Sequence, residues 1–133
     1  LMVPDRKEPP KSLGQNVTIA WNGSLEASRA VTMTLPILRG ANSVTILSSG
    51  GDPETASAVK LQDYLRAHEI ESTISRFSGS GTIGKTLLSL STELEADCLI
   101  MGAYGDSHER ETVFGGHTQH VVEKAEMPVI LVH

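Results

Sequence analysis

The stretch CLIMGAYG, residues 98–105, decides the fold class of this 133-residue chain. Its first four residues are continuously apolar, as expected for a central strand of a sheet that is covered on both faces. Two of its last four residues are glycines, which let a backbone approach a ligand closely because they carry no Cβ. The stretch therefore predicts a buried strand that ends in a ligand-binding loop.

Strand-like and helix-like patterns alternate along the rest of the chain. Apolar or β-branched runs predict further strands at residues 17–21, 44–47, 72–77 and 129–132. Apolar residues at helical spacing predict helices at residues 24–39, 52–68 and 83–94 and a last helix that contains Val121, Val122 and Ala125. This βαβαβαβαβ order requires a parallel α/β sheet with right-handed crossovers and helices on both faces. Such sheets bind ligands at the carboxyl ends of their strands, here after Trp21, Leu47, Phe77 and Met101.

The composition excludes several classes of protein. Sixteen acidic residues against 11 basic ones give a formal net charge of −5, which argues against nucleic acid as a partner. A single cysteine cannot form an internal disulfide, which is typical of a reduced cytoplasmic protein. No apolar run approaches the roughly 18–20 residues of a membrane span. We therefore expect a cytoplasmic domain without a nucleic-acid or membrane partner.

Residues 1–14 differ in character from the domain that we expect over residues 15–133. Pro4, Pro9 and Pro10 and mixed charges without periodicity indicate a linker. The apolar residues before it, Leu1–Pro4, are similar to the last strand of this same chain. One hypothesis is that they are the remnant of the last strand of a preceding, similar domain in a tandem protein. The alternative is an artificial extension.

A second pair of glycines, Gly115 and Gly116, stands at the start of the last predicted helix. A helix N-terminus offers unpaired N–H groups and a positive dipole, and both favour phosphate. Together with Gly102 and Gly105, these residues predict a phosphate-binding loop. The alternative interpretation is a set of ordinary turn glycines.

Four segments resemble the UspA-like universal stress protein family, and the resemblance covers residues 16–133. The segments are Trp21-Asn22-Gly23-Ser24, residues 96–102, the pattern Gly102-x2-Gly105-x9-Gly115, and residues 127–132. The resemblance implies a doubly wound, Rossmann-like sheet of order 3-2-1-4-5, of the adenine nucleotide alpha hydrolase-like type. It also implies binding of ATP or ADP, and dimers that pair through the last strands, here Val129–Val132, or an equivalent pairing with a preceding tandem domain.

The same resemblance implies ten nucleotide-binding residues and no catalytic residue. Adenine would lie near the ends of the first two strands, the base and ribose near the fourth, and the phosphates on the glycine loop. The residues that match these positions are Ala20, Asn22, Ser49, Met101, Gly102, Tyr104, Gly105, Gly115, Gly116 and His117.

Two residues depart from the pattern of the family's ATP-binding branch. Asn22 stands where the family usually has aspartate, and Gly116 stands where it has serine or threonine. Residues 106–111 also carry three acidic groups and one arginine, which would repel a bare triphosphate. Binding therefore implies that Mg²⁺ or Mn²⁺ enters with the nucleotide. No protein residue is predicted to hold a metal, since His117 and His120 lack a clear third ligand.

A competing phosphate motif lies at residues 79–86, GSGTIGKT, which satisfies the P-loop pattern G-x-x-x-x-G-K-[ST]. In a true P-loop, Lys85 would reach the terminal phosphates and Thr86 would hold Mg²⁺. The preceding strand alternates with polar residues, whereas a P-loop strand is normally central and apolar. The motif therefore stays an alternative, a small P-loop phosphotransferase that uses Gly79–Thr86.

The leading hypothesis is a stress-response regulatory module that binds an adenine nucleotide with a divalent cation. We expect at most slow ATP hydrolysis, because the sequence shows no positioned general base and no arginine directed at a transferring phosphate. A second alternative is an interaction module of the same fold that has lost nucleotide binding, which the departures at Asn22 and Gly116 motivate.

Overall fold

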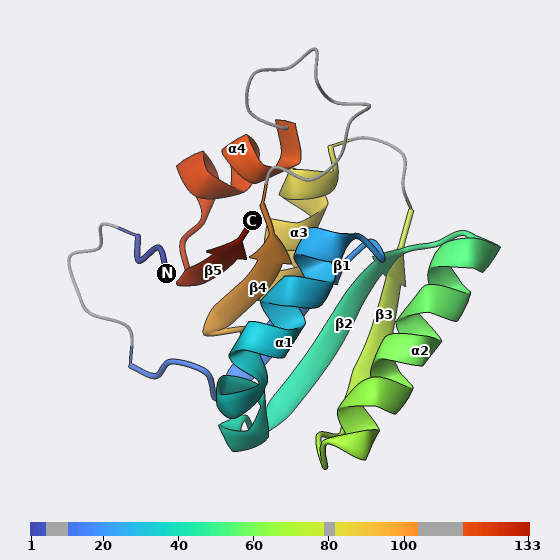
Figure 1. The fold of residues 1–133 in the computed structure, drawn as a ribbon. Coiled ribbons are helices and arrows are strands. Elements are labelled where there is room, and N and C mark those ends of the chain that lie inside the picture. Colours follow the sequence, from blue (N-terminus) through green and yellow to red (C-terminus); the bar gives the residue numbers. More distant parts are fainter. Residues whose placement is uncertain (5–10, 79–81, 104–115) are drawn as a thin grey trace.

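The computed structural model describes residues 1–4, 11–78, 82–103 and 116–133, and in residues 52–55 it describes the backbone alone. Strands and helices alternate through these ranges, which confirms the order predicted from the sequence (Figure 1). The elements are β1 (Asn16–Trp21), α1 (Leu25–Gly40), β2 (Ser43–Ser49), α2 (Asp52–Ala67), β3 (Thr73–Phe77), α3 (Ile83–Glu93), β4 (Cys98–Gly102), α4 (Gly116–Lys124) and β5 (Val129–Val132).

The strands form one sheet in the order β3-β2-β1-β4-β5, in which every pair of neighbours is parallel. This order confirms the one that the family resemblance implied. The helices α1 and α2 cover one face of the sheet and α3 and α4 cover the other (Figure 1). The chain runs outward from β1 to β3 and then crosses to β4 on the other side of β1, so the strand order reverses beside β1.

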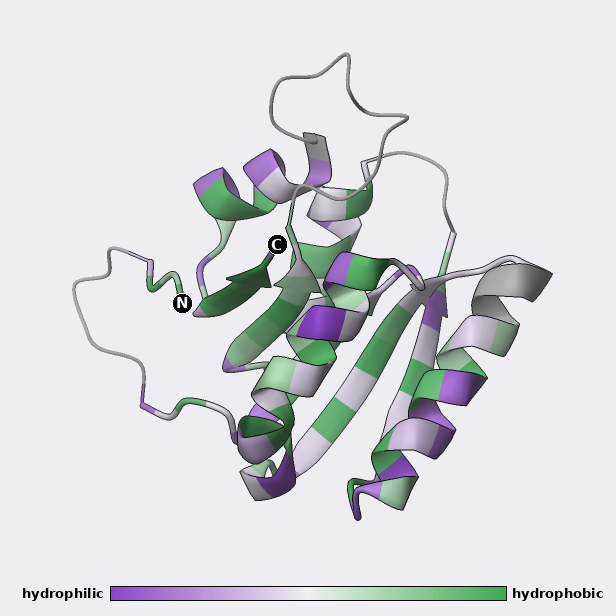
Figure 2. Cartoon of the chain, viewed as in Figure 1, coloured by the Kyte–Doolittle hydropathy of each residue, from purple (hydrophilic) through white to green (hydrophobic). Residues whose placement is uncertain are grey.

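Each face of the sheet has its own hydrophobic core, because side chains along a strand point alternately to the two faces. On β4, Cys98 and Ile100 belong to the larger core under α1 and α2, whereas Leu99 and Met101 belong to the smaller core under α3 and α4. Figure 2 shows the hydrophobic residues concentrated on the strands. All four apolar residues of residues 98–101 are buried, which confirms the prediction of a strand covered on both faces.

Asp97 holds the segment that enters β1 against the start of β4. Its carboxylate accepts hydrogen bonds from the Ser12 hydroxyl (2.6 Å) and from the backbone N–H groups of Gly14 (3.1 Å), Gln15 (3.0 Å) and Asn16 (3.0 Å). Burial alone would raise the pKa of Asp97, but these hydrogen bonds outweigh burial and lower the pKa below its usual value. The charged form of Asp97 therefore stabilises the fold.

The first residues of the chain lie at the outer edge of β5. Met2 and Val129 form an antiparallel bridge, in which Met2 N–H donates to the Val129 carbonyl (2.7 Å) and Val129 N–H donates to the Met2 carbonyl (2.8 Å). The Met2 side chain also packs against the smaller core. The assignment of residues 1–14 to a linker with a strand remnant stays a prediction. Among the helices described, none has the combination of length and hydrophobicity that a membrane span needs.

We predict that Asp97→Asn lowers the free energy of unfolding at pH 7 by about 1–2 kcal/mol, because a neutral amide accepts these hydrogen bonds less strongly. A carboxyl group with a lowered folded pKa stabilises the protein above its unfolded pKa and loses that effect as pH falls through the folded pKa. The difference between wild type and variant should therefore shrink as the pH falls through the acidic range.

Urea unfolding at several pH values measures this difference. The matched control is Asp63→Asn, because Asp63 is exposed and makes a 3.3 Å ion pair with Arg66 on the same helix. Such a surface pair contributes no more than about 0.5 kcal/mol. A loss for Asp97→Asn that stays constant from neutral to acidic pH would show that the charge of Asp97 is not what stabilises the fold.

Candidate functional site

A cavity of about 200 Å³ opens at the carboxyl ends of the strands. Its lining comes from β1, β2, β3, β4, α3, α4 and the loop after β1, in the form of Ala20, Trp21, Asn22, Leu47, Ser49, Phe77, Ile83, Leu87, Met101 and His117. The cavity lies where the strand order reverses, the place at which open parallel sheets bind ligands. We call it the strand-end cavity.

The walls of the strand-end cavity are mostly apolar, with a few polar groups. Among the described residues that line it, Asn22, Ser49 and His117 are the polar ones. Apolar walls with a few polar groups are typical of small-molecule sites, in which the polar groups set the orientation of the ligand. Whole ligand sites usually measure about 300–1,000 Å³. The described walls therefore enclose space for part of a ligand, such as one flat ring system.

Five of the ten predicted site residues lie together around the strand-end cavity. They are Ala20, Asn22, Ser49, Met101 and His117. Gly116 is the first residue of α4, next to His117. Tyr104, Gly105 and Gly115 lie outside the described residues. The structure thus brings half of the predicted set to one cavity, and ligand binding by these residues stays a prediction.

Gly102 has a structural role that the sequence did not reveal. A Cβ on Gly102 would lie 2.6 Å from the backbone nitrogen of Ala27 and 2.7 Å from the carbonyl carbon of Glu26. Both neighbours are backbone atoms of the first helical turn of α1, so they cannot move aside cheaply. The absence of a side chain at Gly102 therefore lets α1 pack closely against the end of β4, and Gly102 does not line the strand-end cavity.

The loop between β1 and α1 forms a rim of the strand-end cavity and is held by two side chains. The Asn22 Oδ1 accepts a hydrogen bond from the Ser24 N–H (3.0 Å), which closes an Asx turn. The Ser24 Oγ accepts from the Ala27 N–H (3.1 Å) and caps α1. Between them, Gly23 has a φ of +74°, a conformation that glycine adopts without strain.

Trp21 connects the strand-end cavity to α2. Its indole Nε1–H donates to the Ser57 Oγ (2.9 Å), and its ring packs against the core between the sheet and α1 and α2. Trp21 is half-buried and is the only tryptophan of the chain. Its emission is therefore expected to report on changes in the cavity.

Five lining residues were not among the predicted site residues. Trp21, Leu47 and Phe77 lie at or near strand ends, so the rule that placed a site there could have found them. Ile83 and Leu87 come from α3, and their helical spacing predicted only a buried helix face. No signal in the sequence indicates that this face borders a cavity.

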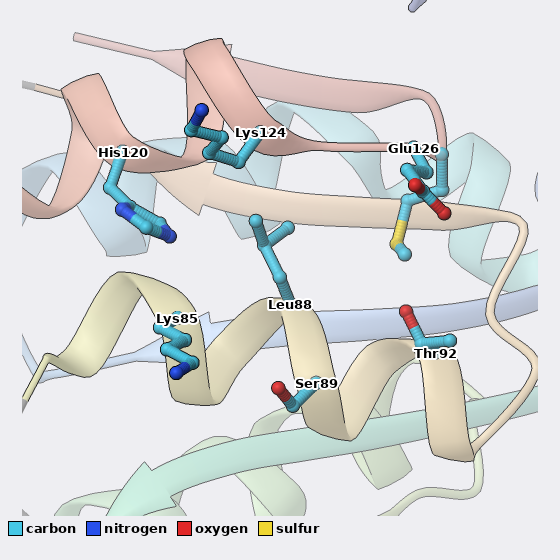
Figure 3. Close-up of a pocket in the computed structure, with 8 residues that line it drawn as sticks. Lys85, Leu88, Ser89, Thr92, His120, Lys124 and Glu126 are labelled. Carbon is cyan, nitrogen blue, oxygen red and sulfur yellow. The ribbon is translucent and has the colours of Figure 1, made fainter.

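The described part of the P-loop-like motif, residues 82–86, places its lysine in a groove separate from the strand-end cavity. Lys85 lines a separate groove of about 610 Å³ between α3 and α4, together with Leu88, Ser89, Thr92, His120, Lys124, Glu126 and Met127 (Figure 3). We call the groove that Lys85 lines the outer groove. A Cβ on Gly84 would lie 3.0 Å from the His117 carbonyl oxygen, so Gly84 lets α3 pack closely on α4. Residues 79–81 of the motif lie outside the described residues.

The strand that precedes this motif is β3, which lies at the edge of the sheet. A P-loop normally follows a central, apolar strand, and its lysine approaches the phosphates. Here Lys85 does not line the strand-end cavity. The two histidines of α4 also lie in different places: His117 lines the strand-end cavity, and His120 lines the outer groove. Within the described residues, no three histidine, cysteine or acidic side chains are grouped to hold a metal ion.

We predict that Gly102→Ala lowers the free energy of unfolding by about 1–3 kcal/mol, because the new methyl group overlaps the first turn of α1. The matched control is Gly40→Ala, since a Cβ on Gly40 meets nothing within 4 Å. The control should leave stability unchanged or raise it by up to about 1 kcal/mol, because alanine favours helix. Thermal and urea unfolding measure both. Equal stability of the two variants would refute this role for Gly102.

Comparisons with known proteins agree with this geometry. The model of the universal stress protein family matches residues 15–133. A search of curated proteins finds no match. Solved structures that are similar to this chain include a universal stress protein from Archaeoglobus fulgidus DSM 4304, with a TM-score of 0.73, 23% identity, and coverage of 90% of this chain and 44% of that longer chain.

Two further similar structures were solved with nucleotides. A universal stress protein in complex with cAMP has a TM-score of 0.68 and 24% identity, and the match covers 90% of this chain and 96% of that one. The Archaeoglobus fulgidus universal stress protein in complex with dAMP has a TM-score of 0.66 and 17% identity, and the match covers 90% and 98% of the two chains. With a family match over residues 15–133 and this shared fold, the chain belongs to the universal stress protein family.

Proposed function

We propose that this chain binds an adenine nucleotide together with a divalent cation in the strand-end cavity, and that it acts as a regulatory module in a stress response. The observation that carries the proposal is the cavity itself, an apolar slot with polar residues at the point where the strand order reverses. The complexes of two similar proteins with cAMP and dAMP support the choice of adenine.

In this proposal the base lies between the apolar residues of the cavity, such as Leu47, Phe77 and Met101. Ser49 and Asn22 supply polar contacts at its edge. The phosphates extend toward the start of α4, where Gly116 begins the helix and His117 lines the cavity. The N–H groups and the dipole of a helix N-terminus favour an anion at this position.

A divalent cation is part of the proposal because of charge. Residues 106–111 contain Asp106, Glu109 and Glu111 and only one arginine, and the whole chain has a net charge of −5. A nucleotide that arrives with Mg²⁺ or Mn²⁺ carries less negative charge and is repelled less. No carboxylate and no arginine is among the described residues that line the cavity. We therefore propose a nucleotide sensor with at most slow hydrolysis rather than a phosphotransferase.

We predict saturable binding of ATP in the presence of Mg²⁺, measured by isothermal titration calorimetry and by the emission of Trp21. Ser49→Phe should abolish it, because a phenyl ring at Ser49 occupies the strand-end cavity. The matched control Lys85→Ala should leave the affinity unchanged, because Lys85 lines the outer groove. Circular dichroism checks that both variants fold.

Three outcomes would contradict this proposal. No saturable binding below millimolar ATP would favour an interaction module of the same fold that has lost nucleotide binding. Loss of binding in Lys85→Ala alone would favour a P-loop phosphotransferase. Full binding by a folded Ser49→Phe variant would place the nucleotide outside the strand-end cavity.

We also propose that β5 pairs with a strand of a second universal stress protein domain, supplied by another copy of the chain or by a preceding tandem domain. The Met2–Val129 bridge supports this, since it shows that the outer edge of β5 accepts an antiparallel strand. Because alternate residues of a strand bond to opposite sides, the N–H and C=O of Leu131 face the same outer edge as those of Val129. The longer Archaeoglobus fulgidus chain, of which this chain matches 44%, is in keeping with a tandem.

We predict a homodimer in sedimentation velocity experiments, weakened about tenfold or more by Leu131→Pro. Proline removes an N–H from the outer edge of β5 and leaves the pairing with β4 in place. Val59→Ala is the matched control, because Val59 is exposed on α2 and should not affect assembly. A chain that sediments as a monomer at every concentration, with or without the substitution, would contradict the homodimer.

A further inference from the structure

Asn22 and Gly23 form an exposed Asn-Gly pair in the loop between β1 and α1. In such a pair the backbone nitrogen of the glycine can attack the side-chain carbonyl carbon of the asparagine, because glycine has no side chain that hinders the approach. The attack forms a succinimide and releases ammonia, a reaction called deamidation. Three groups decide its rate, namely the nitrogen that attacks, the carbonyl that is attacked and the amide nitrogen that leaves.

The attacking and the leaving nitrogen are both accessible to solvent. The Gly23 N–H makes no hydrogen bond to any residue that the structure describes, and Gly23 is exposed. The Asn22 Nδ2 has no partner within the described ranges either, and Asn22 is exposed as well. Solvent can therefore take the proton from the Gly23 N–H and protonate the amide nitrogen as it leaves.

The attacked carbonyl is activated by the turn. Its oxygen, Asn22 Oδ1, accepts a hydrogen bond from the Ser24 N–H at 3.0 Å, which folds the side chain back over the peptide bond between Asn22 and Gly23. As a nitrogen adds to the carbonyl carbon, negative charge develops on this oxygen, and an N–H donor at such a distance stabilises that charge. The Ser24 backbone is itself held, because its carbonyl accepts from the Ser28 N–H at 3.0 Å. The hydrogen bond that closes the turn thus also assists the reaction.

The chain has two other asparagines, Asn16 and Asn42, and both lack these conditions. The side-chain amide of Asn16 donates to two backbone carbonyls, at 2.6 and 3.1 Å, and the next residue, Val17, is fully buried in β1. Asn42 is followed by Ser43, whose backbone N–H donates to a carbonyl at 3.1 Å. Among the three asparagines, only Asn22 combines a free attacking nitrogen, an activated carbonyl and an exposed leaving group.

We infer that Asn22 is a site of spontaneous deamidation in the folded protein, which converts the neutral amide at the rim of the strand-end cavity into a carboxylate. The Gly23 nitrogen forms a bond to Asn22 Cγ, the bond from Cγ to Nδ2 breaks, and Nδ2 leaves as ammonia in exchange for the proton that Gly23 gives up. Water then opens the succinimide at one of its two carbonyl carbons. One product is aspartate, and the other is isoaspartate, in which the main chain runs through the side chain.

Either product changes the charge of a residue that lines the strand-end cavity. Isoaspartate also adds a carbon atom to the main chain between β1 and α1, at the turn that Asn22 and Ser24 close. A sample of the protein therefore accumulates a second, more acidic form with time. This inference needs no ligand in the cavity and does not rest on the proposed function.

Tandem mass spectrometry of digests, taken while the whole chain is incubated at neutral and mildly alkaline pH, measures the reaction residue by residue. Asn22 should gain the mass difference between NH2 and OH at least about tenfold faster than Asn16 and Asn42, whose reacting groups must first be released by local opening. The rate should rise with pH, because the Gly23 N–H must lose its proton. Asn22→Gln should stay unconverted over the same time, because its longer side chain does not form the succinimide.

The wild-type chain unfolded in guanidinium chloride is the reference, because it contains the same Asn-Gly pair without the turn. The folded protein should convert Asn22 at a rate within about tenfold of that reference, since the reacting groups need little or no opening. An Asn22 that stays intact in the folded protein while the unfolded chain converts would overturn the inference, because the fold would then protect the residue.

Ser24→Pro tests the activating hydrogen bond, because proline has no N–H and its ring fits the φ of −71° at this position. Ser24→Ala is the matched control, since it also removes the capping hydroxyl but keeps the N–H that bonds to Asn22. Conversion in Ser24→Pro should be slower than in Ser24→Ala by about tenfold or more, as expected for the loss of an oxyanion donor. Equal rates in the two variants, with folding checked by circular dichroism, would contradict the role of the turn. If Ser24→Pro does not fold, the comparison of folded and unfolded wild type decides.

Discussion

The pairing of β1 with β2 on one side and β4 on the other is the constraint on which the rest of the structure depends. All three strands are parallel, so their carboxyl ends meet at one edge of the sheet, and the strand order reverses there. The residues of β1 reach both helical layers. Val17 and Ile19 pack into the core under α1 and α2, whereas the buried Thr18 hydroxyl bonds to Ser91 of α3 at 2.8 Å. The reversal leaves a gap between the loops, and that gap is the strand-end cavity.

Gly102 and the loop between β1 and α1 hold the start of α1 in place beside this cavity. Gly102 lets the first turn of α1 approach the end of β4, and the hydrogen bonds from Asn22 to Ser24 and from Ser24 to Ala27 fix the loop that enters α1. Asn22 lines the cavity from this loop, so the side chains that hold the start of α1 also hold one rim of the proposed nucleotide site.

The sequence predicted the element order well because each element has a strong local period, and the apolar run of residues 98–101 marked the strand that both layers cover. Ala20, Asn22, Ser49 and Met101 were predicted as site residues from the family resemblance, and the structure brings them together because each lies at or just after the end of a parallel strand. The contribution of Ile83 and Leu87 could not be predicted, since periodicity identifies a buried helix face but not its neighbour. The groove beside Lys85 could not be predicted either, because it depends on how closely Gly84 lets α3 pack against α4.

Hydrogen–deuterium exchange with and without ATP and Mg²⁺ tests the central claim most directly, namely that the strand-end cavity is the nucleotide site. Exchange in the presence of a bound ligand slows where backbone amides are covered or held. The account predicts slower exchange at residues 20–24, 49–51 and 101–103 and at the start of α4, and unchanged exchange along the outer groove at residues 88–92 and 124–127. Protection confined to the outer groove, with none at the strand ends, would contradict it.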